Sequence, residues 1–167
     1  MISQVDPTGE PVAAEIHAVA QAAYALEAEW IACRGFPPLR ESVADLRESS
    51  DTFLVFRRSG AVLAALSYCR LISAVTVTRL VVHPAHLRQG IATALLIELE
   101  QRISATIVYV STAAANLPAV QLYQRQGYTP VMVTKSAENI ELVSLSKQLP
   151  GSQRSRTLSS CECAFCC

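Results

Sequence analysis

Apolar residues in the first part of the chain recur at helical spacing. Over Val12–Cys33 they return every three or four positions, as expected for a helix with one buried face. The predicted buried positions of this helix are Ile16, Val19, Ala20, Ala23, Leu26 and Trp30. The adjacent prolines Pro37 and Pro38 exclude a continuing helix, and Ser42–Glu48 predicts a second, short one.

The pattern then changes to the runs that are typical of strands. DTFLVFRR (51–58) and AVLAALSYCR (61–70) predict a β-hairpin with Ser59 and Gly60 in its turn. AVTVTRLVV (74–82) is rich in β-branched residues and predicts a third strand, which ends just before a proline.

A helix and another strand follow this third strand. Residues 91–103 keep apolar side chains on one helical face, and ATIVYVST (105–112) is again a strand pattern. The apolar positions of that face are Ile91, Ala94, Leu95, Leu99 and Ile103. Because strands joined by a helix run parallel, this order predicts a parallel βαβ unit within a mixed sheet.

The end of the periodic pattern predicts one more helix and two strands. AAANLPAVQLYQRQG (113–127) is a loop and a helix, with Pro118 suited to the first turn and Gly127 to the end. YTPVMVTK (128–135) and ENIELVSLSKQ (138–148) predict an antiparallel pair of strands. The pattern ends near residue 149.

Composition supports one globular domain. The chain has 167 residues, 51% of them hydrophobic, and a formal net charge of zero. These values argue against a disordered chain and against a nucleic-acid binder, which would carry excess basic charge. We predict a single domain over residues 1–149 and a flexible cysteine-rich tail over 150–167, with no metal site. The tail cysteines are Cys161, Cys163, Cys166 and Cys167.

The sequence also bears on location and partners. Charges interrupt every apolar stretch before the roughly 18 residues that a bilayer-spanning helix needs. The first residues lack the basic start and apolar run of a signal peptide. We therefore expect a cytoplasmic protein without a membrane partner, either a monomer or a homodimer.

The turn after the third strand has features of an anion site. In HLRQGIAT, Gly90 stands where the helix should begin, and the first helical N–H groups have no partner within the helix. Arg88 adds a cation, Ala92 is small, and the Thr93 hydroxyl can donate. Taken alone, these features also fit an ordinary capped helix start.

A second motif lies further along the chain, in NLPAVQLYQRQGY (116–128). Together with VHP (82–84) and RQGIA (88–92), it resembles the GCN5-related N-acetyltransferase (GNAT) superfamily. Asn116, Ala119, Leu122, Tyr123, Gly127 and Tyr128 stand in the family's order and spacing. The resemblance covers about residues 51–149. It implies an α/β (α+β) fold: a mixed, largely antiparallel sheet with a central parallel βαβ unit and flanking helices.

The resemblance implies acetyl-CoA as co-substrate and assigns residues to it. The backbone of the third strand would bind the pantetheine arm, and the amides that open the next helix would bind the pyrophosphate. The implied coenzyme-binding residues are Leu80, Val81, Val82, Arg88, Gln89, Gly90, Ile91, Ala92, Thr93, Asn116 and Tyr123. Leu87 stands where the family usually has Arg or Gln, and this departure predicts weaker coenzyme binding.

Tyr123 matches the family tyrosine that protonates or hydrogen-bonds the coenzyme sulfur, so the resemblance implies it as the general acid. Asn116 is expected to touch the pantetheine or to cap the helix, and both roles can coexist.

The general base is less defined. Ser111 stands where some relatives carry a glutamate, and a hydroxyl cannot replace that carboxylate. The remaining candidates are Glu27, Glu29, Glu41 and His83, or a water relay without a dedicated base. Among these residues we name Glu29.

The predicted function is N-acetylation of a primary amine of a small molecule, or of a peptide as the second choice. The amine would attack acetyl-CoA directly in a ternary complex. The alternative is an acyl-CoA-binding sensor or a catalytically weakened module. A role of the cysteine tail in metal binding is a third hypothesis, with no supporting ligand spacing.

Overall fold

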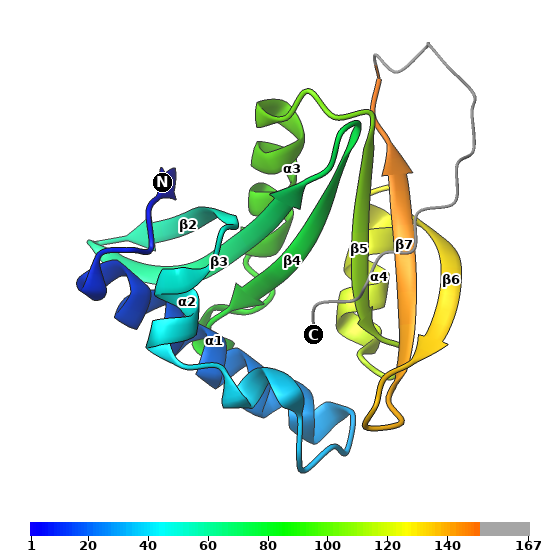
Figure 1. The fold of residues 1–167 in the computed structure, drawn as a ribbon, viewed down its shortest axis with the longest axis horizontal. Helices are drawn as coiled ribbons and strands as arrows, with labels where there is room; N and C mark the ends of the chain where they lie inside the picture. The colour runs from blue at the N-terminus through cyan, green and yellow to red at the C-terminus, as the bar shows by residue number, and fades with distance from the viewer. Residues whose placement is uncertain (151–167) are drawn as a thin grey trace.

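The computed structural model describes residues 1–150, which form a seven-stranded sheet with helices on both faces (Figure 1). The strand order is β1-β2-β3-β4-β5-β7-β6. The strands are β1 (Ile2–Val5), β2 (Thr52–Arg58), β3 (Ala61–Arg70), β4 (Ala74–Val82), β5 (Ile107–Ala113), β6 (Thr129–Lys135) and β7 (Glu141–Gln148). The helices are α1 (Glu10–Trp30), α2 (Val43–Glu48), α3 (Ile91–Arg102) and α4 (Leu117–Arg125), with the 3₁₀ turns η1 (Pro37–Arg40) and η2 (Pro84–His86).

The pairing of the strands confirms the predicted fold class. β4 and β5 run parallel, and the other neighbouring strands run antiparallel. The turn between β2 and β3 also follows the prediction, since Ser59 has φ 51° and Gly60 has φ 86°. Two successive positive φ angles are what a two-residue type I′ hairpin turn requires.

The sheet packs on helices through two apolar clusters, one on each face. On one face, α1 and α2 cover β2, β3 and β4 through buried residues such as Ile16, Leu46 and Phe53. On the other face, α3 and α4 pack on the sheet around Leu95, Leu99 and further buried residues. Figure 1 shows α3 behind β3 and β4, and α4 behind β5 and β7.

The N-terminal region differs from the sequence analysis in three places. Strand β1 was missed because a four-residue edge strand offers too few alternating positions to be seen in the sequence. Trp30 was predicted as buried but is 44% exposed. Figure 1 shows the C-terminal end of α1 running past the end of β4, so its last turn has no sheet to cover. Ala32, with φ 53°, ends the helix earlier than predicted.

None of the helices in residues 1–150 has the length and apolar character that crossing a bilayer requires. The predicted cysteine-rich tail lies outside the described residues, apart from Pro150.

Candidate functional site

The parallel strands β4 and β5 pair over a short length and then separate. Their paired residues are Ala74–Thr76 of β4 with Ile107–Tyr109 of β5, whereas β4 continues to Val82. Within residues 1–150, the edge of β4 that faces β5 therefore has no paired strand from Val77 onward. Leu80, Val81 and Val82, the predicted pantetheine positions, lie on this free part of β4. We call this region the β4–β5 separation.

The turn between β4 and α3 has backbone features that would favour a bound anion. Gly90 is the N-cap of α3, with φ 76° and no side chain to cap the helix. Its carbonyl accepts the Ala94 N–H at 2.9 Å, so the amides of Ile91–Thr93 precede the first bond of the helix ladder. A Cβ at Gly90 would meet nothing within 4 Å, so the backbone here is open to a ligand. The predicted phosphate-binding amides thus share one exposed helix end.

A cation from a different part of the chain reaches the same turn. Arg58, at the tip of the β2–β3 hairpin, donates from Nη1 to Gln89 Oε1 at 2.9 Å. Because 31 residues separate Arg58 from Gln89, no local pattern in the sequence indicates this contact. Arg58 and Arg88 therefore both lie near the start of α3, where the helix dipole also favours negative charge.

Asn116 and Tyr123 are held in place by α4. Asn116 caps the helix, because its Oδ1 accepts the Ala119 N–H at 3.2 Å. Tyr123 is 5% exposed and packs edge-on against Tyr128, with ring centroids 5.7 Å apart. Burial raises the pKa of Tyr123 well above its usual range, and the neighbouring Glu27 raises it further. The phenol therefore keeps its proton at neutral pH and can act as an acid.

Glu27 joins these two residues from the other side of the β4–β5 separation. Its Oε1 accepts a hydrogen bond from Asn116 Nδ2 at 2.8 Å, which links α1 to the start of α4. Burial raises the pKa of this carboxyl, and the hydrogen bond from Asn116 offsets part of that effect. A buried carboxyl with a raised pKa is a candidate general base.

The other base candidates lie in less suitable surroundings. Glu29 is exposed on the next part of α1. Glu41 is ion-paired with Arg79, and His83 Nδ1 accepts the Ala85 N–H at 3.2 Å. Ser111 accepts a hydrogen bond from Ser144 at 3.4 Å. Among the described residues, none of these four side chains bonds to Asn116 or Tyr123, whereas Glu27 accepts a hydrogen bond from Asn116.

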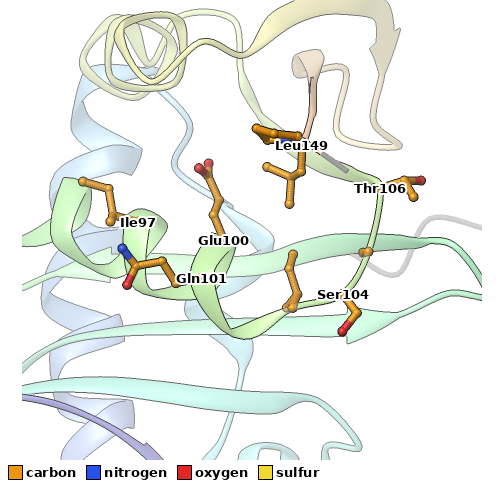
Figure 2. A pocket seen from close by; sticks show the side chains of 9 residues that line it. Ile97, Glu100, Gln101, Ser104, Thr106 and Leu149 are labelled. Atoms are coloured by element: carbon orange, nitrogen blue, oxygen red, sulfur yellow. The ribbon is translucent and has the colours of Figure 1, made fainter. Parts of the chain in front are cut away.

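A separate pocket of about 320 Å³ lies at the other end of α3 (Figure 2). Ile97, Glu100 and Leu149 are among the residues around it. Glu100 is already engaged there, because it binds Lys147 at 2.7 Å and accepts from the Tyr128 hydroxyl at 3.0 Å. None of the motif residues lines this pocket, so we do not assign the chemistry to it.

Solved structures of acetyltransferases share this fold. The ribosomal-protein-S18-alanine N-acetyltransferase of Escherichia coli superposes with a TM-score of 0.68 at 18% identity, over 96% of this chain and 100% of the other. A GCN5-related N-acetyltransferase of Rhodopseudomonas palustris gives 0.73 at 17% identity, over 89% and 95% of the two chains. The PaiA N-acetyltransferase of Thermoplasma acidophilum, solved with coenzyme A, gives 0.71 at 13% identity, over 89% and 99%.

Sequence comparison adds one curated relative and a family. The UPF0157 protein YqkA of Bacillus subtilis is 37% identical over 132 residues, which are 78% of this chain. The matched region is only 38% of that protein, so the relative is much longer than the part it shares. Residues 35–149 match the family described as the acetyltransferase (GNAT) domain. The strand separation, the open helix start and this match lead to one conclusion: the chain belongs to the GNAT acetyltransferase family.

Proposed function

We propose that this acetyltransferase transfers the acetyl group of acetyl-CoA to a primary amine of a small molecule. The observation that carries the proposal is the meeting of Glu27, Asn116 and Tyr123 beside the β4–β5 separation. The amine would attack the thioester directly while both substrates are bound. A peptide amine is the second choice of acceptor.

The residues at the start of α3 fit a coenzyme pyrophosphate. Unpaired amides after Gly90, the helix dipole and the cations Arg58 and Arg88 all favour a bound anion. The free edge of β4 at Leu80–Val82 offers backbone groups to an extended pantetheine arm. Acetyl-CoA, once bound, would supply the acetyl group as a reactive thioester. Two solved relatives by fold contain coenzyme A or acetyl-CoA, which supports the same co-substrate here.

The proposed proton transfers follow from the placement of Glu27 and Tyr123 on either side of Asn116. Glu27 would take a proton from the amine as the N–C bond forms, and the C–S bond breaks in the same sequence. Tyr123 would give its proton to the leaving sulfur, and the amine proton held by Glu27 balances that loss. Since Asn116 contacts Glu27 and caps the helix of Tyr123, it holds the two groups in fixed relation.

The charges near Tyr24 favour an amine as the acceptor. Burial raises the pKa of Tyr24 to about 12, Arg79 lowers it, and the carboxylates of Glu41 and Glu27 raise it further. Arg79 is paired with Glu41, so Glu27 is the carboxylate here without a cationic partner among the described residues. An ammonium ion would supply that missing positive charge.

The proposed function is tested by an acetyl-transfer screen. Release of coenzyme A from acetyl-CoA is followed with amines, amino acids, polyamines and short peptides, and products are identified by mass spectrometry. We expect release that depends on at least one amine, with an N-acetylated product. Tight coenzyme binding without transfer to any of these acceptors would contradict the proposal and favour the acyl-CoA sensor.

Leu87 provides a prediction about coenzyme affinity. Leu87 is 36% exposed and has an extended backbone, so an arginine fits there without strain. Leu87→Arg should bind coenzyme A about threefold more tightly, because an added exposed charge contributes up to about 1 kcal/mol. Calorimetric titration measures the change, and Leu71→Arg in the distant β3–β4 turn is the matched control. Equal affinity in both variants would show that position 87 lies outside the phosphate site.

Arg58 provides a second prediction about the same site. Arg58→Gln should weaken coenzyme A binding about three- to tenfold, and the difference should shrink as salt screens the charge. Arg102→Gln, at the opposite end of α3, is the control and should bind as the unaltered protein does. A loss of affinity that does not depend on salt, or no loss of affinity, would show that Arg58 does not contribute to the phosphate site.

A further inference from the structure

The ion pair between Glu41 and Arg79 is a largely buried polar contact that the proposed chemistry does not use. Glu41 follows η1 at the end of the connection from α1 to α2, residues 31–42, and Arg79 lies on β4. The Arg79 side chain is 10% exposed and that of Glu41 21%. Arg79 also donates from Nη1 to Ser67 Oγ at 3.0 Å and lies over the Phe53 ring.

This pair is incompletely satisfied. Glu41 Oε2 and Arg79 Nε are both buried without a hydrogen-bond partner among the described residues. Burying charged groups with unpaired atoms costs free energy, and buried ion pairs often stabilise a fold no better than apolar side chains of similar volume. A contribution to the stability of the fold is therefore a weak explanation for this ion pair.

Further contacts converge on Glu41 and tie its backbone to α1. Its carbonyl accepts from His17 Nε2 at 2.9 Å and from Gln21 Nε2 at 3.3 Å. The next residue, Ser42, caps α2 in a reciprocal capping box with Asp45. The end of the connection is thus fixed both to α1 and, through Arg79, to β4.

The location of this anchored connection links it to the acceptor. Arg79 lies on the part of β4 that is not paired with β5. The charges of Glu41 and Glu27 both raise the pKa of Tyr24. Figure 1 shows the α1–α2 connection beneath the diverging ends of β4 and β5. An acceptor that reaches Glu27 would pass this connection.

We propose that the Glu41–Arg79 pair is a positioning contact that fixes the α1–α2 connection as a wall of the acceptor site. This inference rests on the proposed function. Neither residue touches the reacting atoms. The pair determines how well an acceptor larger than a minimal amine is held against Glu27.

The test removes both charges at once, because breaking one partner would leave a buried unpaired charge and destabilise the fold. The variant is Glu41→Gln with Arg79→Met, and the control is Glu98→Gln with Arg102→Met, which removes the exposed ion pair of α3. Thermal unfolding is measured first, to check that both variants fold. Arg79→Lys is a second variant, which keeps the charge but loses the planar fork that binds Glu41 and Ser67 together.

Two readouts decide the outcome. Trypsin should cleave after the exposed Arg34 faster in the Glu41/Arg79 variant than in the control. In kinetics with tryptamine and propylamine as acceptors, kcat/KM for tryptamine should fall about tenfold through KM, with propylamine little changed. Arg79→Lys should lie between the variant and the unaltered protein.

Other results would overturn the inference. Unchanged cleavage would show that the pair does not hold the connection. Faster cleavage with an unchanged ratio between the two amines would reduce the pair to a structural contact. If the unaltered protein acetylates neither amine nor any other in the screen, the proposed function fails, and this inference fails with it.

Discussion

Replacing Tyr123 by phenylalanine is expected to lower kcat about 100-fold, the low end of the range for general acid catalysis. The change removes one hydroxyl from a side chain that is 5% exposed and keeps the ring that packs on Tyr128. Burial raises the pKa of Tyr123, so this acid stays protonated over the working pH range. Without it, the thiolate of coenzyme A must leave unprotonated or wait for a proton from water.

The affinity for coenzyme A and the thermal midpoint should change little in Tyr123→Phe, since no packing is lost. Tyr128→Phe is the matched control on the neighbouring ring. It removes a hydroxyl that donates to Glu100 at 3.0 Å, away from the proposed chemistry. We expect a loss of stability there but not of kcat. Equal rates for Tyr123→Phe and the unaltered protein would exclude Tyr123 as the acid.

Glu27→Gln is expected to have an effect of similar size on kcat/KM, about 100-fold at neutral pH. Glutamine keeps an oxygen for the Asn116 hydrogen bond but cannot accept the amine proton. Because burial raises the pKa of Glu27, the rate of the unaltered enzyme should rise with pH as this carboxyl ionises above the ordinary glutamate range. That acidic limb of the pH profile should disappear in the variant.

The matched control is Glu29→Gln, two positions along the same helix and exposed. It also tests the base that the sequence analysis named. A small effect there and a large one at Glu27 would favour Glu27. A large effect at Glu29 and a small one at Glu27 would favour Glu29 as the base and contradict the proposed arrangement.

The same variant has an expected effect on stability, whose sign follows from the raised pKa. The folded state binds the proton of Glu27 more tightly than the unfolded state, so ionisation costs stability as pH rises through the folded pKa. Glutamine does not ionise, so Glu27→Gln should unfold at a higher temperature than the unaltered protein at about pH 8. The difference should shrink as pH falls toward the ordinary glutamate pKa. A gain that grows at low pH would contradict this reading of Glu27.

Much of the fold could be predicted because its signals are local. Helical and strand periodicities indicated α3, β5 and the hairpin of β2 and β3, and a parallel βαβ unit followed from their order. Asn116 was expected to touch the pantetheine or to cap its helix, and its hydrogen bond to Ala119 confirms the cap. Edge strand β1 was too short to give such a signal.

The site was harder to predict because its contacts join distant segments. Glu27 and Glu29 are separated by about 200° around a helix, so only one can face the sheet. Glu27 continues the spacing of Ala20 and Tyr24, a signal that the sequence did contain. The Glu41–Arg79 pair spans 38 residues, and no local pattern reveals it.

The central claim is that an amine attacks acetyl-CoA directly beside Glu27 and Tyr123. Initial rates measured while acetyl-CoA and an accepted amine are both varied test it most directly. Lines that intersect in double-reciprocal plots are the predicted result, because both substrates must be bound before transfer. Parallel lines, together with an acetylated protein detected by mass spectrometry in the absence of amine, would show a covalent intermediate and contradict the account.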